Sequence, residues 1–137
     1  MGKREDHFLE IDGVRVLGEY KCSESALATV KKFFENELPD QEEFEVCYSF
    51  ETLGRCLPDF EYDSLSVEEL ESQIEAGNPV IVSTIPDEQD ELHSVVVAGF
   101  NDEIFEVISD GERLELGREE FEMAWGRTGN NSLTRGN

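Results

Sequence analysis

The sequence predicts a single α+β domain, in which a helix near the N-terminus packs on an antiparallel sheet supplied mainly by the second half of the chain. Apolar residues recur at three- and four-residue intervals after Cys22, which is typical of an amphipathic helix. Short apolar runs with period-two alternation follow Pro79 and indicate strands. A length of 137 residues suits one hydrophobic core, so we expect residues 1–137 to form one domain.

The first half is predicted to contain a hairpin and the amphipathic helix. Residues 8–17 alternate around Asp12-Gly13, a dipeptide that favours a type I′ turn, so residues 8–11 and 14–17 are expected to pair as strands. The helix is expected to run from Cys22 to about Asn36. Residues 37–64 give no clear pattern, because Pro39, Gly54 and Pro58 interrupt any long element.

The second half is easier to interpret. Ser66 and Glu69 have the spacing of a capping box, and Gly77 stands where the helix they begin should end. Four strands and a short helix are then expected at residues 80–84, 94–100, 104–108, 113–116 and 118–125. The tail, residues 126–137, is rich in Gly, Asn and Ser and is expected to be flexible.

The charge excludes some partners. With 33 acidic against 11 basic residues, the formal net charge is -22, which suits a solvated surface in a high-salt host, where molar salt screens the self-repulsion. The same charge repels phosphate backbones, so nucleic acid is not an expected partner. Without an apolar signal segment or a membrane-length apolar run, the chain is expected to be cytoplasmic and not membrane-bound.

The three cysteines do not suggest a metal site. No CxxC spacing is present and only two His accompany them, so we expect no metal or other cofactor. Cys47 and Cys56 could form a disulfide around a short loop, but two buried thiols are the favoured alternative in a reducing cytosol. An odd count leaves at least one thiol free.

Cys22, His93 and Asp110 form the candidate site. A helix N-terminus lowers the pKa of a thiol, because its free N–H groups and its dipole stabilise the thiolate. His93 opens one strand and Asp110 follows its antiparallel neighbour, so the two ends can meet and supply a base and the group that orients it. Taken singly, each has an ordinary structural explanation: a packed thiol, a surface imidazole and an Asp-Gly turn.

The order of these elements resembles that of papain-like cysteine peptidases, especially the bacteriocin-leader (double-glycine) peptidases. The resemblance covers about residues 14–126, through CSESALATVKKFF, GNPVIV, HSVVVAGF, FEVISDG and REEFEMAW. It implies a papain-like fold with Cys22 as nucleophile, His93 as general base and acid, and Asp110 as orienting carboxylate. It also implies a peptide or protein substrate.

Two positions depart from the family pattern. Val16 stands where the family has a Gln that helps to form the oxyanion hole, and Ser23 stands where it has Gly. The candidate replacement donors are the Cys22 N–H and Glu19, which can serve only if it is protonated or if the alignment slips. One hypothesis is therefore a cysteine peptidase or amidohydrolase adapted to high salt. The alternative is a catalytically silent module that binds a protein partner in a larger cellular or viral assembly, virion-associated if viral.

Overall fold

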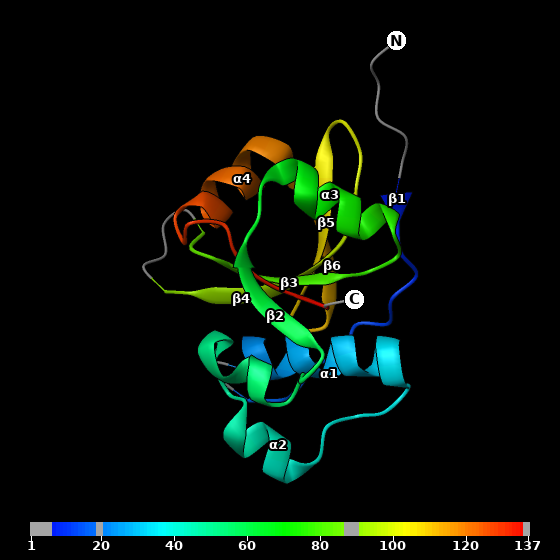
Figure 1. Ribbon diagram of the computed structural model, residues 1–137, viewed down its shortest axis with the longest axis vertical. Helices are drawn as coiled ribbons and strands as arrows, with labels where there is room; N and C mark the ends of the chain where they lie inside the picture. The colour runs from blue at the N-terminus through cyan, green and yellow to red at the C-terminus, as the bar shows by residue number, and fades with distance from the viewer. Residues whose placement is uncertain (1–6, 19–20, 87–90, 136–137) are drawn as a thin grey trace.

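The computed structural model describes residues 7–18, 21–86 and 91–135, and shows the expected combination of helices with an antiparallel sheet (Figure 1). The helices, in chain order, are α1 (Cys22–Glu35), α2 (Gln41–Val46), the 3₁₀ helix η1 (Phe50–Arg55), α3 (Val67–Glu75) and α4 (Arg118–Gly126). The strands are β1 (His7–Phe8), β2 (Phe60–Ser64), β3 (Val80–Thr84), β4 (His93–Phe100), β5 (Ile104–Ser109), β6 (Glu112–Gly117) and β7 (Asn131–Arg135).

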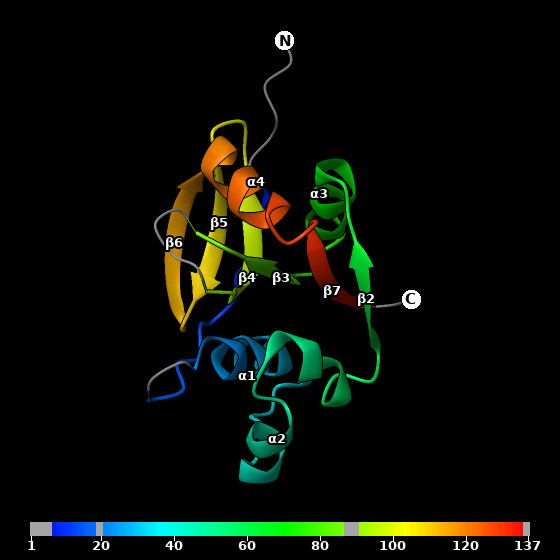
Figure 2. The same ribbon diagram turned by 90° about the vertical axis from the view of Figure 1, so that its left-hand side faces the viewer.

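The strands of the described residues form one seven-stranded antiparallel sheet that helices cover on both faces. Its order is β2-β7-β3-β4-β5-β6, with β1 pairing with β4 off this path. Helices α1 and α2 lie on one side of the sheet, and α3 and α4 lie on the other (Figure 2). The α+β fold class predicted from the sequence is therefore confirmed.

Alternation along β4 supplies both halves of the core. Val96 and Ala98 pack in a cluster with Leu27 of α1, while neighbouring side chains of the same strand pack with α3 and α4 on the opposite face. Successive side chains of a strand point to opposite faces, so an unbroken apolar run is what a strand covered on both sides requires. Burial on both sides fixes the position of His93, the first residue of β4.

The capping box predicted for α3 is confirmed. The Ser66 hydroxyl accepts from the Glu69 N–H, the Glu69 carboxylate accepts from the Ser66 N–H, and Gly77 follows the helix with a positive φ of 88°. Helix α1 begins differently, because Lys21 precedes it without a side-chain cap. The first N–H groups of α1 therefore keep their hydrogen-bonding capacity beside Cys22.

The predicted hairpin at Asp12-Gly13 is wrong. Only β1 pairs there, with β4, and the next residues run along α1, where the N–H groups of Val14 and Val16 donate to side-chain hydroxyls of the helix at 2.9 Å each. A Cβ at Gly13 would lie 2.1 Å from the carbonyl oxygen of Gly111, so this segment packs tightly on another turn. Residues 8–17 alternate because Leu9 and Ile11 pack against the core cluster that contains Leu27 of α1, while the polar residues beside them face solvent.

The prediction of a flexible tail over residues 126–137 is also wrong for the part that the structure describes. Strand β7 lies between β2 and β3, and Leu133 is fully buried in the core. The polar residues before it form the reversal after α4, with φ of 59° at Asn130 and 74° at Gly129. Turn composition was mistaken for disorder, because pairing with two distant strands leaves no local signal.

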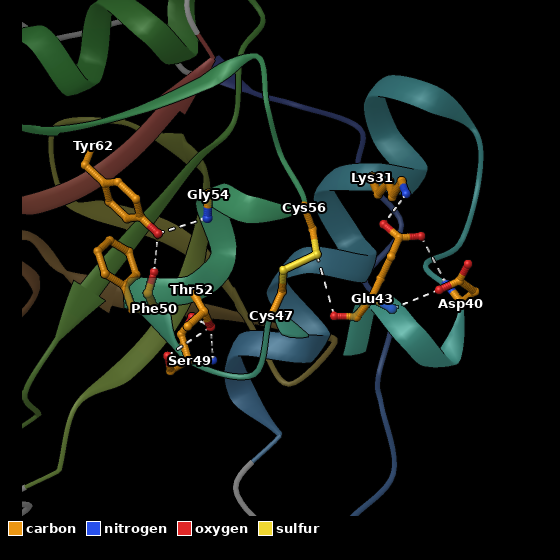
Figure 3. Close-up of a disulfide and its surroundings, with 10 residues drawn as sticks. All are labelled: Lys31, Asp40, Glu43, Cys47, Ser49, Phe50, Thr52, Gly54, Cys56 and Tyr62. Carbon is orange, nitrogen blue, oxygen red and sulfur yellow. Dashed lines mark hydrogen bonds and ion pairs between the residues drawn. A yellow bond between two sulfur atoms is a disulfide. The ribbon is translucent and has the colours of Figure 1, made fainter. Parts of the chain in front are cut away.

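The region 37–64, for which the sequence gives no clear pattern, folds around a disulfide between Cys47 and Cys56 (Figure 3). The prediction that these two cysteines are buried thiols is therefore wrong. The enclosed segment contains η1, and the Tyr62 hydroxyl donates to the Phe50 carbonyl at 2.6 Å and accepts from the Gly54 N–H at 2.9 Å. Cys47 is completely buried. The disulfide and Tyr62 thus hold η1 against β2.

Opening this disulfide is expected to lower the free energy of unfolding by about 2–3 kcal/mol, because the unfolded chain regains the freedom of a short closed loop. The measurement is denaturant unfolding in molar KCl, with the Cys47→Ala/Cys56→Ala variant and the oxidised and reduced wild type compared. Cys22→Ala is the control and should respond to reductant as the wild type does. Three reactive thiols in the denatured, unreduced protein would contradict the bond, since Cys47 is completely buried in the native fold.

Candidate active site

Cys22, His93 and Asp110 all line one open cleft of about 430 Å³. The start of α1, the start of β4 and the turn after β5 bring them there from sequence positions up to 88 residues apart, the difference between 22 and 110. Cys22 is half-buried and is the free cysteine of the chain. A thiol that is neither sealed in the core nor fully solvated can meet a substrate.

The surroundings of the Cys22 thiol favour its ionised form. Burial alone would raise its pKa, but the hydrogen bond from His93, the backbone N–H of Ser94 and the charge of His93 together bring the pKa below its usual value. The Ser94 N–H donates to the Cys22 sulfur at 3.5 Å. The free N–H groups at the start of α1 act in the same direction.

The pKa of His93 is shifted in the opposite direction, above its usual value. Its hydrogen bond with Cys22 raises its pKa, burial opposes the rise, and the negative charges of Cys22 and Asp110 add to it. A lowered thiol pKa and a raised imidazole pKa in the same pair favour a thiolate beside an imidazolium. This is the charge state that a cysteine nucleophile requires before it attacks a carbonyl carbon.

Asp110 lies near His93 but is not its hydrogen-bond partner in this arrangement. It occupies a two-residue turn between β5 and β6, with φ of 50° at Asp110 and 80° at Gly111, as a type I′ turn requires. The ring nitrogen Nε2 of His93 instead contacts the Ser109 hydroxyl at 2.7 Å. Asp110 acts on the ring through its charge.

Ser23, at the position where the resemblance leads us to expect glycine, makes a buried contact with β4. Its hydroxyl is buried and lies 2.8 Å from that of Ser94. Ser23 follows Cys22, and Ser94 follows His93, so this hydrogen bond joins α1 to β4 directly beside the two candidate reacting groups. The substitution thus helps to hold thiol and imidazole at a fixed separation.

The sequence leaves three candidate positions for an oxyanion donor, Val16, Glu19 and the backbone N–H of Cys22. Val16 lines the cleft with a side chain that cannot donate, and its own N–H is bonded to the Ser25 hydroxyl. Glu19 lies outside the described residues. The backbone N–H of Cys22 lies in the first turn of α1 and is the remaining candidate donor to an oxyanion formed at the Cys22 sulfur.

One wall of the cleft was not predicted from the sequence. Tyr48, Ser49, Phe50 and Glu51 line it, and all four lie within the segment that the disulfide closes. Their positions depend on the disulfide and on Tyr62, neither of which produces a periodic pattern.

Within the described ranges, no group of three potential ligands could hold a metal ion, and no helix has the length and apolarity of a membrane span.

Comparison with known proteins finds a family model and several solved structures that are similar to this chain. The sequence model of the Peptidase_C39 like family matches residues 9–133. No curated protein matches the chain. A crystal structure described as a C39-like peptidase from Bacillus anthracis is similar with a TM-score of 0.79 at 17% identity, covering 97% of this chain and 98% of that one.

Two further solved structures share the fold. The peptidase domain of Streptococcus ComA, a bifunctional ABC transporter in quorum sensing, has a TM-score of 0.70 at 18% identity, with coverage of 93% and 100%. A double-glycine motif protease from an AMS/PCAT transporter, in complex with its leader peptide, has a TM-score of 0.71 at 15% identity, with 98% of each chain covered.

Proposed function

The chain belongs to the Peptidase_C39 like family, and on that premise we propose that it is a cysteine peptidase that hydrolyses a peptide bond with Cys22, His93 and Asp110. The observation that carries the proposal is the pairing of a thiol of lowered pKa with an imidazole of raised pKa in an open cleft. Perturbed ionisable groups that face each other in a cleft are characteristic of active sites.

In the proposed mechanism, the Cys22 thiolate attacks the carbonyl carbon and the carbonyl oxygen becomes an oxyanion. The Cys22 N–H stabilises that charge. The His93 imidazolium then gives its proton to the departing amine, and a thioester remains on Cys22. Water, deprotonated by His93, attacks the thioester, so that a carboxylate product leaves and the thiolate is restored. The Asp110 carboxylate stabilises the imidazolium through its charge.

The alternative of a silent binding module rests on Val16, whose side chain supplies no oxyanion donor. Loss of one such donor typically costs about 10²–10³ in rate, which slows a peptidase without abolishing its chemistry. A thiol of lowered pKa beside an imidazole of raised pKa suits a nucleophile and its base better than a purely structural module. We therefore favour a slow or specialised enzyme over an inactive one.

The first substrate class to test is a peptide with a double-glycine motif, because a similar structure was solved as a double-glycine motif protease with its leader peptide. The assay is mass spectrometry of such peptides, and of a mixed peptide library, incubated with the protein in molar KCl, which screens the -22 net charge. Hydrolysis at one bond is expected. An intact library together with an unreactive Cys22 would favour the silent module.

A further inference from the structure

We infer that Ser109 is the positioning residue of this site: its hydroxyl holds the His93 ring and leaves Nδ1 free to exchange a proton with Cys22. This inference rests on the proposed function and assigns to a serine the orienting role expected for Asp110. The contact that carries it is the 2.7 Å separation between His93 Nε2 and Ser109 Oγ.

The sheet fixes this contact. In the register of β4 against β5, Val96 faces Ile108 and Val97 faces Val107. Ser109 is the last residue of β5, and alternation puts its side chain on the same face as Val107, diagonally across from His93. Both ends of the pair are therefore set by backbone pairing, and the His93 carbonyl also accepts from Thr84 Oγ1 at 3.1 Å.

The environment on the Nε2 side makes the serine hydroxyl necessary. His93 and Ser109 line a second cavity of about 320 Å³, distinct from the cleft that contains Cys22. Its lining is largely apolar, from residues Val95, Val107, Leu114 and Leu116 among others. A ring N–H that faces such a lining would lose a hydrogen bond without Ser109, and an unmade buried hydrogen bond is costly.

The contact also selects a tautomer. A neutral imidazole carries its proton on one nitrogen, and the hydrogen bond made by that nitrogen decides which one it is. When His93 Nε2–H donates to Ser109 Oγ, Nδ1 is left unprotonated and can accept the proton of Cys22. In the imidazolium, Nε2–H keeps the same acceptor while Nδ1–H faces the thiolate.

Asp110 does not make this contact: it lies in the turn after β5, and it acts on the ring through its charge. Charged groups surround the ring from several elements, and all of them influence its protonation. Those of the described residues that line the two cavities with His93 are Cys22, Arg15, Lys21, Glu51, Glu91, Asp110 and Glu120. The hydrogen bond of His93 Nε2 goes to the Ser109 hydroxyl, so these charged groups act on the protonation of the ring and Ser109 acts on its orientation.

The test compares Ser109→Ala and Ser109→Thr with the wild type in molar KCl. The readouts are the pH profile of Cys22 alkylation by iodoacetamide and, with a cleaved peptide, kcat and KM separately. Ser109→Ala is expected to slow alkylation at neutral pH and to lower kcat by about tenfold, with KM unchanged. Ser109→Thr, which keeps the hydroxyl, is expected to restore both to within about twofold of the wild type.

The tautomer gives a second, independent readout. ¹⁵N chemical shifts above the pKa of His93 should show the Nε2–H form in the wild type and a mixture in Ser109→Ala, with His7→Asn to assign the two histidines. A folded Ser109→Ala protein with wild-type tautomer, rate and pH profile would overturn the inference. If wild-type Cys22 is no more reactive than the unfolded thiol, the proposed function itself fails, which distinguishes the two failures.

Discussion

Replacing Cys22 by alanine is expected to lower peptide hydrolysis by at least about 10⁴-fold, to the level of buffer, because no other group in the cleft forms the acyl intermediate. Loss of a nucleophile removes both steps of the reaction, attack and thioester hydrolysis. The fold should survive, since Cys22 is half-buried at the start of α1 and contributes little to either core cluster.

The measurement is the initial rate of cleavage, with thermal unfolding of the same preparations as the control for folding. Cys22→Ser serves as the closer match in size and should be almost as inactive, because a hydroxyl is far harder to ionise than a thiol. Hydrolysis by Cys22→Ala at a rate near that of the wild type would show that the activity resides elsewhere.

His93→Asn is expected to lower kcat/KM by about 10³-fold, since it removes the general base and acid of both steps. His7→Asn is a matched control from the same chain, because His7 is part of β1, stacks on Phe100 and lies 3.8 Å from Glu75. It should retain the wild-type rate. Equal losses in the two variants would indicate a general effect on folding and would contradict the role of His93.

Local signals were enough to predict the elements that position the site. The periodicity after Cys22 predicted α1, the Ser66–Glu69 capping box predicted α3, and the apolar runs predicted strands β3 to β5. These patterns depend on residues that are close in sequence, and the burial of β4 on both faces makes its run unmistakable. Because Cys22 begins α1, His93 begins β4 and Asp110 follows β5, predicting these elements also predicted where the three residues lie.

Features that depend on pairing between strands far apart in the sequence were not predicted. The dipeptide Asp-Gly occurs twice, and only Asp110-Gly111 turns a hairpin, because β5 and β6 flank it. Asp12-Gly13 is exposed and belongs to the segment between β1 and α1, which forms no second strand. Strand β7 was missed because it pairs with β2 and β3, far away in sequence.

Ser109 was missed for a related reason. A serine before Asp-Gly has no distinguishing local pattern, and only the register of β4 against β5 brings it to His93. The disulfide wall of the cleft likewise depends on Cys47 and Cys56 meeting in space. Sequence spacing identified the residues proposed to react, whereas the contact of Ser109 with His93 depends on how distant strands pair.

We propose that Cys22 and His93 form a thiolate–imidazolium pair, and the pH dependence of Cys22 alkylation measures the ionisation of that thiol. With Cys47 and Cys56 bonded, alkylation without reductant reports Cys22 alone. In the wild type, the midpoint is expected below the ordinary thiol value of about 8.5, so that alkylation persists as the pH falls through neutrality. In His93→Asn it should rise to that value or above, because burial then acts on the thiol with less opposition. Midpoints that coincide in the wild type, in His93→Asn and in the denatured chain would rule out this pair.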